Sequence, residues 1–189
     1  MSIKVAINGF GRIGRCTLRA IYEQGLQNEF EVVAINASGD LATNAHLLKY
    51  DTTHGRFGTS VETEGENTII IDGKKIPFYS TKDPKGVNWG SHGVDVLLEC
   101  TGAYTTKAKA QALLDQGAKR VLISAPGGDD VDTTIVMGVN EGALKADMTV
   151  VSNASCTTNC LAPVAKILSD AIGIKQGLMT TIHAYTNDQ

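Results

Sequence analysis

Ile3-Lys-Val-Ala-Ile-Asn8 is followed at once by Gly9-Phe-Gly-Arg-Ile-Gly14, and a helical pattern of apolar residues continues from there. The first six residues are mostly apolar, which predicts a buried strand. The glycines have the Gly-x-Gly-x-x-Gly spacing that joins a strand to a helix in dinucleotide-binding units. In such a unit Gly9 permits a tight turn, Gly11 lets the backbone approach a pyrophosphate, and Gly14 allows close helix packing. This stretch therefore predicts a phosphate site at a helix N-terminus.

Further strands are expected at Phe30–Asn36, Val94–Cys100 and Arg120–Ser124, with a helical pattern between the last two. Strands that alternate with helices and are apolar on both faces predict a parallel sheet. The run Thr68–Tyr79 contains Asp72-Gly73 between two strand-like halves, which indicates a hairpin insertion. The expected fold class is therefore α/β, a Rossmann-type dinucleotide-binding fold with a mostly parallel sheet and a hairpin insertion.

The second strand ends in Asn36-Ala-Ser-Gly39, where many dinucleotide sites have an acidic residue that binds the ribose 2′-hydroxyl. Asp40 comes too late to replace it. A carboxylate there would repel the 2′-phosphate of NADP, so Ala37 removes a barrier and the Ser38 hydroxyl could donate to that phosphate. The alternative is an NAD site that lacks one contact.

A candidate nucleophile lies in Asn153-Ala-Ser-Cys-Thr-Thr-Asn-Cys160. A strand is expected at Met148–Ser152 and a helix at Thr157–Ile172, which puts Cys156 at the strand-to-helix turn. Free backbone N–H groups and the helix dipole stabilise an anion at such a turn, and thiolates form there.

His183 is the candidate base. The predicted helix rises roughly 24 Å, and a predicted strand at Gln176–His183 returns roughly 26 Å. If the strand runs back beside the helix, His183 arrives level with Cys156. The alternative is a structural cysteine and a histidine that only satisfies a core hydrogen bond.

The other cysteines give no metal signature. Cys160 follows Cys156 by one helical turn, but no second pair completes a zinc set, so no metal site is expected. Cys16 and Cys100 have the surroundings of ordinary core thiols.

Composition narrows the class of protein further. The chain has 189 residues, of which 42% are hydrophobic, with 17 basic and 20 acidic residues and a net charge of −3. No basic run could follow a phosphate backbone, so nucleic acid is not expected as a main partner. No membrane span and no signal-peptide pattern are found, and we expect a cytoplasmic protein with reduced thiols.

Several stretches together resemble phosphorylating glyceraldehyde-3-phosphate dehydrogenases. The matching stretches are Asn8-Gly-Phe-Gly-Arg-Ile-Gly-Arg15, Lys49-Tyr-Asp-Thr-Thr-His-Gly-Arg-Phe57, Glu99-Cys-Thr-Gly102, Ile123-Ser-Ala-Pro126, Ser152-Asn-Ala-Ser-Cys-Thr-Thr-Asn-Cys160 and His183-Ala-Tyr-Thr-Asn-Asp-Gln189. They extend over the whole sequence, and the cysteine motif is highly specific. The resemblance implies an enzyme of glycolysis and gluconeogenesis that acts as a homotetramer.

The resemblance also implies a reaction. Cys156 would attack the aldehyde of D-glyceraldehyde 3-phosphate, hydride would pass to NAD or NADP, and inorganic phosphate would release 1,3-bisphosphoglycerate from a thioester. His183 would act as acid or base at the substrate oxygen.

The remaining roles are carried over position by position. The implied cofactor contacts are Gly9, Gly11, Arg12, Ile13, Gly14, Ala37, Ser38, Lys82, Thr101, Gly102 and Ser124. The implied phosphate ligands are Ser155 and Thr157 for the attacking phosphate and Thr186 for the substrate phosphate. Ala37 occupies the position of the aspartate typical of NAD-specific members, which favours NADP or dual use. Any of the hydroxyl residues could instead be a cap or turn residue.

The resemblance further implies that family chains continue well beyond Gln189. We therefore expect a dinucleotide-binding domain at residues 1–154 and the beginning of a catalytic α+β domain at 155–189, with little activity from these residues alone. Two other functions stay open: an erythrose-4-phosphate dehydrogenase, which shares the cysteine motif, and a dinucleotide-binding module without turnover.

Overall fold

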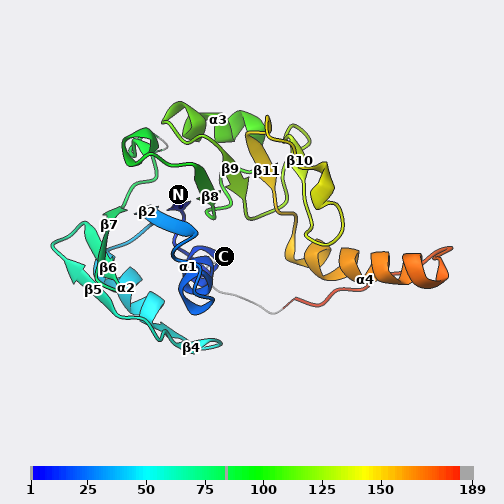
Figure 1. Cartoon of the computed structure of the whole chain (residues 1–189), viewed down its shortest axis with the longest axis horizontal. Coiled ribbons are helices and arrows are strands. Elements are labelled where there is room, and N and C mark those ends of the chain that lie inside the picture. Colours follow the sequence, from blue (N-terminus) through cyan, green and yellow to red (C-terminus); the bar gives the residue numbers. More distant parts are fainter. Residues whose placement is uncertain (1, 84, 184–189) are drawn as a thin grey trace.

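The computed structural model describes residues 2–83 and 85–183, and its helices and strands follow one another in α/β order (Figure 1). The helices are α1 Arg12–Glu23, α2 Leu41–Lys49, α3 Lys107–Asp115 and α4 Cys156–Ile172, with short 3₁₀ turns at Trp89–His92 and Glu141–Ala143. The strands are β1 Ile3–Asn8, β2 Phe30–Asn36, β3 Tyr50–Asp51, β4 Gly55–Arg56, β5 Val61–Glu64, β6 Thr68–Ile71, β7 Lys74–Tyr79, β8 Val96–Glu99, β9 Val121–Ile123, β10 Thr133–Thr134 and β11 Val150–Ser152.

A nine-stranded sheet in the order β10-β11-β9-β8-β1-β2-β7-β6-β5 organises the described residues, beside a small β3-β4 hairpin. The strands from β10 to β7 pair in parallel, and β5, β6 and β7 pair antiparallel. The carboxyl ends of β1, β2, β8, β9 and β11 therefore meet at one edge, where open α/β sheets bind ligands.

Both faces of the sheet are buried. Because successive strand side chains point to opposite faces, Ile7 and Ile35 join a core with α1 and α2, whereas Ala6 and Ala34 join a second core with α3 and Trp89. These six-to-seven-residue parallel strands are apolar on both sides for this reason.

The structure confirms most of the predicted elements. β1 and β2 have the predicted bounds, and β8, β9 and β11 lie within the predicted strands. The expected hairpin is formed by β6 and β7 with Asp72 and Gly73 at φ 52° and 75°, as a tight two-residue turn requires. Its second strand also pairs with β2, so the hairpin extends the main sheet.

Several elements differ from the prediction, and the short strands β3, β4, β5 and β10 were not predicted. α2 was not predicted, although Asp40 caps it by accepting from the Thr43 N–H at 2.8 Å. The strand predicted at Gln176–His183 is wrong, because these residues pair with no strand in the described part of the chain and their side chains are exposed. These residues do run back beside α4, as the comparison of the helix length with the length of the returning segment suggested (Figure 1).

None of the helices within residues 2–83 and 85–183 is long and apolar enough to cross a lipid bilayer.

Candidate functional site

The glycine turn between β1 and α1 is built by close backbone packing. Gly9 has φ 97°, and a Cβ there would lie 2.6 Å from the Cys100 carbonyl carbon and the Thr101 nitrogen. A Cβ on Gly14 would lie 2.2 Å from the Gly9 carbonyl oxygen. Gly11 caps α1, and a Cβ there would meet nothing within 4 Å. Gly9 and Gly14 are therefore required by packing, while Gly11 leaves open space at the helix N-terminus.

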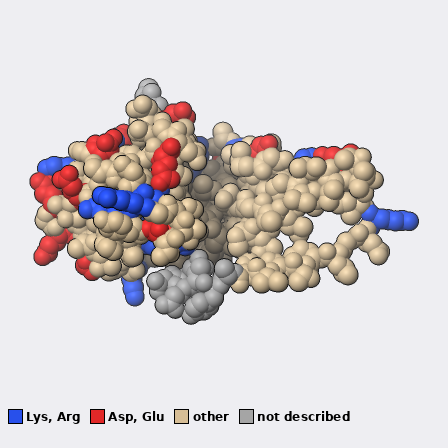
Figure 2. All heavy atoms as spheres, turned by 90° about the horizontal axis from the view of Figure 1, so that it is seen from below, with Lys and Arg blue, Asp and Glu red and all other residues tan. Residues whose placement is uncertain are grey.

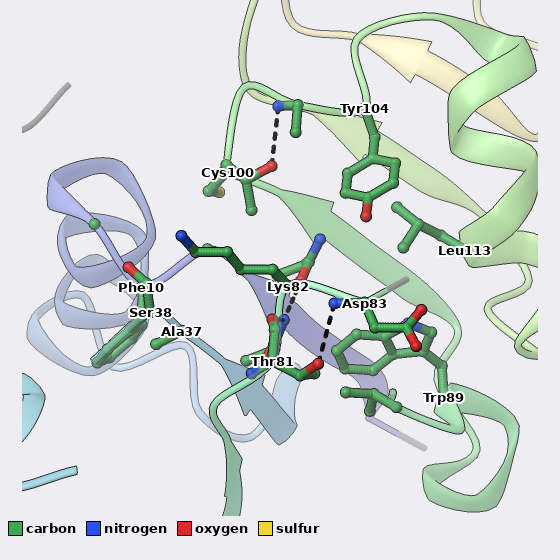
Figure 3. A pocket seen from close by; sticks show the side chains of 17 residues that line it. Phe10, Ala37, Ser38, Thr81, Lys82, Asp83, Trp89, Cys100, Tyr104 and Leu113 are labelled. Atoms are coloured by element: carbon green, nitrogen blue, oxygen red, sulfur yellow. Dashed lines mark hydrogen bonds between the residues drawn. The ribbon is translucent and has the colours of Figure 1, made fainter. Parts of the chain in front are cut away.

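A cavity of about 370 Å³ opens beside this turn at the carboxyl edge of the sheet (Figure 3). Its volume is in the range of small-molecule sites, about 300–1,000 Å³. Six of the predicted cofactor contacts line it: Gly9, Gly11, Ala37, Ser38, Lys82 and Thr101. The Lys82 side chain extends across the cavity toward the side that carries Phe10 and Ser38 (Figure 3).

The wall opposite Ala37 and Ser38 was missed by the sequence analysis. It is formed by Trp89 and Tyr104 with Leu113 behind them (Figure 3). Trp89 is 1% exposed, and its Nε1 has no hydrogen-bond partner among the described residues. An apolar and aromatic wall of this kind suits the flat face of a heterocyclic base. Tyr104 follows β8, but Trp89 lies in a 3₁₀ turn and Leu113 in α3, so no single local pattern in the sequence marks this wall.

Other predicted cofactor contacts lie around the turn but do not line the cavity. Gly14 packs beneath Gly9, Gly102 follows Thr101 with φ 75°, and Ser124 follows β9. Ile13 is 46% exposed on α1. Their contact with a cofactor stays a prediction.

Arg12 is engaged elsewhere. Its guanidinium donates two hydrogen bonds to Asp51, at 2.9 and 3.2 Å. The backbone N–H groups of His54 and Thr53, together with Arg12, hold the pKa of Asp51 down at about 2. The Arg12 side chain is thus held by Asp51, while its backbone N–H lies at the N-terminus of α1, where a pyrophosphate would bind.

The second part of the site is the turn from β11 to α4. Ala154 has φ 60°, a left-handed conformation that non-glycine residues seldom adopt. The fully buried Ser152 hydroxyl accepts from the Ala154 and Gly127 N–H groups, both at 3.0 Å, and donates to the Ala125 carbonyl at 2.7 Å. Ser152 thus ties the turn before the nucleophile to the loop after β9.

Cys156 lies at the strand-to-helix junction, as predicted, although α4 begins at Cys156 itself, one residue before the predicted helix. Ser155 is the N-cap of α4 and accepts from the Thr158 N–H at 2.9 Å. The His183 ring lies at the same end of the helix, with Nε2 3.2 Å from the Thr157 hydroxyl and 3.1 Å from the Thr181 hydroxyl. The described structure forms no hydrogen bond between Cys156 and His183. It therefore brings the predicted pair to one helix end without joining the two side chains.

The role of the predicted phosphate ligands stays a prediction, and the structure gives only the local partners of two of them. Ser155 serves as a cap and Thr157 contacts His183, so each hydroxyl has a local partner. Thr186 lies outside the described residues.

α4 and the returning segment expose a large apolar surface. No residue of α4 is buried, and Val164, Ile167 and Ile172 are exposed. In the space-filling view this extension carries few charged atoms, and an opening separates the helix from the returning segment (Figure 2). Exposed apolar surface of this kind is typical of a face that binds another surface.

The other thiols differ in accessibility. Cys100 lines the cavity, and burial raises the pKa of its thiol to about 11. Cys160 is exposed on α4, and Cys16 is half-buried on α1. Cys100 is therefore a poor nucleophile, and of the two exposed thiols Cys156 is the one at the N-terminus of a helix.

The chain is similar to known proteins over its whole length. The family model described as "Glyceraldehyde 3-phosphate dehydrogenase, NAD binding domain" matches residues 3–107, and the one described as "Glyceraldehyde 3-phosphate dehydrogenase, C-terminal domain" matches residues 155–189. Similar curated proteins include the plasmid-encoded glyceraldehyde-3-phosphate dehydrogenase of Cupriavidus necator, with 58% identity over 189 residues. Those of Pseudomonas aeruginosa and Bacillus subtilis (glyceraldehyde-3-phosphate dehydrogenase 2) are 54% and 51% identical. The alignments cover 100% of this chain and 56%, 56% and 54% of these relatives, so the chain spans about half of their length.

The parallel sheet, the glycine turn and the cavity beside it define a protein of the Rossmann-type dinucleotide-binding class. Within that class, the chain belongs to the glyceraldehyde 3-phosphate dehydrogenase family.

Proposed function

We propose that this chain contains the dinucleotide site and the nucleophile of a phosphorylating glyceraldehyde-3-phosphate dehydrogenase. The observation that carries the proposal is the position of Cys156 at the first residue of α4, at the same sheet edge as the cavity. A thiol at a helix N-terminus is favoured as a thiolate, and the cavity has the glycine turn that a pyrophosphate needs. Erythrose-4-phosphate dehydrogenase has no separate observation in its favour.

The mechanism follows from the chemistry of the thiolate. Cys156 adds to the aldehyde carbon of D-glyceraldehyde 3-phosphate and forms a thiohemiacetal. His183 acts as the acid or base at the oxygen of this intermediate. The carbon-bound hydrogen of the thiohemiacetal would pass as hydride to NAD or NADP, when bound, while the proton on its oxygen would pass to His183. The thioester that remains on Cys156 is attacked by inorganic phosphate held near Ser155 and Thr157, which releases 1,3-bisphosphoglycerate and restores the thiolate.

The residues around the cavity would hold the cofactor in two parts. The glycine turn and the N-terminus of α1 would hold the pyrophosphate, and the partly exposed Tyr104, with the buried Trp89 beside it, would form the wall against the adenine. We place the boundary between the dinucleotide-binding domain at 1–154 and the catalytic part at 155–189, where α4 leaves the sheet. We further propose a cytoplasmic homotetramer, and the four free thiols suit a reducing compartment.

Residues 1–189 alone are expected to bind a dinucleotide. A typical enzyme has a turnover number of roughly 10 s⁻¹, and we expect these residues to reach no more than about one-thousandth of that rate. The reason is geometric: Cys156 and His183 are exposed and not hydrogen-bonded to each other, so water is not excluded from the nucleophile. The measurement is reduction of NAD and of NADP with glyceraldehyde 3-phosphate and inorganic phosphate. A Cys156→Ser chain sets the background, and acyl-phosphate formation at the rate of a complete enzyme would contradict the expectation.

The cofactor preference is expected to depend on Ala37. Replacement by aspartate places a carboxylate at the end of β2, where it accepts bonds from the ribose hydroxyls and repels a 2′-phosphate. Two like charges about 4 Å apart near a surface repel by roughly 4 kcal/mol. A tenfold change in affinity needs only about 1.4 kcal/mol. We therefore expect Ala37→Asp to lower the ratio of NADP affinity to NAD affinity at least about tenfold.

The control for this change is Ala37→Asn, which has the same shape without the charge. Titration of the unaltered chain, Ala37→Asp and Ala37→Asn with both cofactors separates charge from size. If Ala37→Asn shifts the ratio as far as Ala37→Asp, the electrostatic explanation fails. If the unaltered chain binds NAD tenfold more tightly than NADP, the NADP assignment of Ala37 and Ser38 fails.

A further inference from the structure

Glu99 is a buried carboxylate that the proposed mechanism does not use. It ends β8, is 1% exposed, and forms no ion pair in the described part of the chain. Burial raises the pKa of this carboxyl, although hydrogen bonds oppose the shift. A buried acidic group without a cation is costly, so its retention needs a structural reason.

Both Glu99 oxygens act as acceptors. One accepts from the Asn8 side-chain amide at 2.6 Å, and the other accepts from the Thr101 backbone N–H at 2.7 Å and from the Thr101 hydroxyl. Asn8 ends β1 and immediately precedes Gly9. The carboxylate therefore joins the two turns that contribute Gly9 and Thr101 to the cavity.

The hydrogen bonds continue in one direction to the far side of the cavity. The Asn8 side-chain oxygen accepts from the Asn36 amide at 2.8 Å. That amide also donates to the Thr81 carbonyl at 3.0 Å, while the Asn36 oxygen accepts from the Thr81 N–H at 3.1 Å. The chain of bonds thus runs from Thr81, beside Lys82, through Asn36 and Asn8 to Glu99.

The direction of this chain is fixed at its start. A backbone N–H only donates and a backbone carbonyl only accepts, so Thr81 allows one orientation of the Asn36 amide. That orientation fixes Asn8, which must then present its NH₂ group to residue 99. Residue 99 must meet donors on both sides, from Asn8 and from the Thr101 N–H, and only a group with two acceptor oxygens does so.

We propose that Glu99 is a positioning residue for dinucleotide binding, whose carboxylate ends a one-directional hydrogen-bond chain that holds the ends of β1, β2 and β8 in place around the cavity. This inference rests on the proposed dinucleotide site. The packing supports it, because Gly9 lies so close to Cys100 and Thr101 that no Cβ fits between them. A shift of either turn would displace the phosphate site directly.

The test is a double-mutant cycle at Asn8 and Glu99. Glu99→Gln puts an NH₂ group against the Asn8 NH₂ group, and Asn8→Asp puts two carboxylates against each other. We expect each single change to weaken NAD binding at least tenfold. In the combined variant the new amide at position 99 donates to the new carboxylate at position 8. That carboxylate still accepts from Asn36, so every donor again meets an acceptor at unchanged net charge, and the affinity should return to within threefold of the unaltered chain.

The readouts are the dissociation constant for NAD, by calorimetry, and the thermal unfolding midpoint. Glu31→Gln, which removes a surface carboxylate paired with Lys74, is the matched charge control and should leave the affinity unchanged. If Glu99→Gln fails to fold, recovery of folding and NAD binding in the combined variant supports the proposal. A Glu99→Gln chain that binds like the unaltered chain, or a combined variant no better than the single ones, overturns it. Absence of binding by the unaltered chain to either NAD or NADP would instead overturn the proposed function, and this inference with it.

Discussion

Replacement of Gly14 by alanine is expected to destabilise the fold strongly, although alanine is the better helix former. In an exposed helix the change would stabilise by about 1 kcal/mol. Here the new Cβ would lie 2.2 Å from the Gly9 carbonyl oxygen and 3.0 Å from the Ile7 side chain. Because the obstacle is backbone, no side-chain rotation relieves it, and we expect a net loss of more than about 3 kcal/mol in the free energy of unfolding. Urea unfolding followed by circular dichroism measures this loss.

Gly11→Ala is the matched control, because it adds the same methyl group three residues away. A Cβ there meets nothing within 4 Å, and Gly11 already has a negative φ of −71°. Alanine is a poorer N-cap than glycine, and Gly11→Ala should lower the free energy of unfolding by no more than about 1 kcal/mol. The methyl group would project where a pyrophosphate approaches, so dinucleotide affinity should fall while stability is kept. A Gly14→Ala chain as stable as Gly11→Ala would show that the turn can relax, contrary to the packing argument.

The fold could be predicted where local pattern and tertiary packing agree. Ile3–Asn8 and Phe30–Asn36 are apolar throughout because both faces of their strands are buried, and their predicted bounds match the structure. Asp72-Gly73 predicted its hairpin correctly, because both positions of the turn need a positive φ and few other residue pairs adopt it. Gln176–His183 has the composition of a strand, but a strand also needs a neighbour to pair with, and composition does not supply one.

The site could be predicted only in part. The glycine turn and the Cys156 helix start follow from local sequence, because each is one strand-to-helix junction. The aromatic wall and the Glu99 chain do not follow from local sequence, because each joins residues from separate elements of the chain. Arg12 shows the same limit: a matching motif suggested a phosphate contact, but Asp51, 39 residues away, binds its side chain.

Asp132 is expected to carry the largest single polar contribution to stability at the β10 edge of the sheet. One carboxylate oxygen accepts from the Thr149 and Val150 N–H groups at 2.8 and 2.9 Å, and the other pairs with Lys107. Asp132→Ala leaves these two partly buried N–H groups without their acceptor, at about 1–3 kcal/mol each. We expect the free energy of unfolding at pH 7 to fall by about 2–4 kcal/mol. Asp132→Asn keeps one oxygen for the two N–H groups and should lose about half as much.

The loss should also depend on pH in a defined direction. Lys107 and the Val150 N–H hold the pKa of Asp132 well below that of an ordinary aspartate. Above about pH 5 the residue is ionised in both folded and unfolded chains, and its stabilising effect is complete. As the pH falls further, the unfolded chain binds the proton first, so the stabilisation declines toward the folded pKa. The difference in unfolding free energy between the unaltered chain and Asp132→Ala should therefore be constant from about pH 7 to 5 and shrink below about pH 4. A difference that grows on acidification would mean that Asp132 is stabilised in its protonated form, opposite to what its donors require.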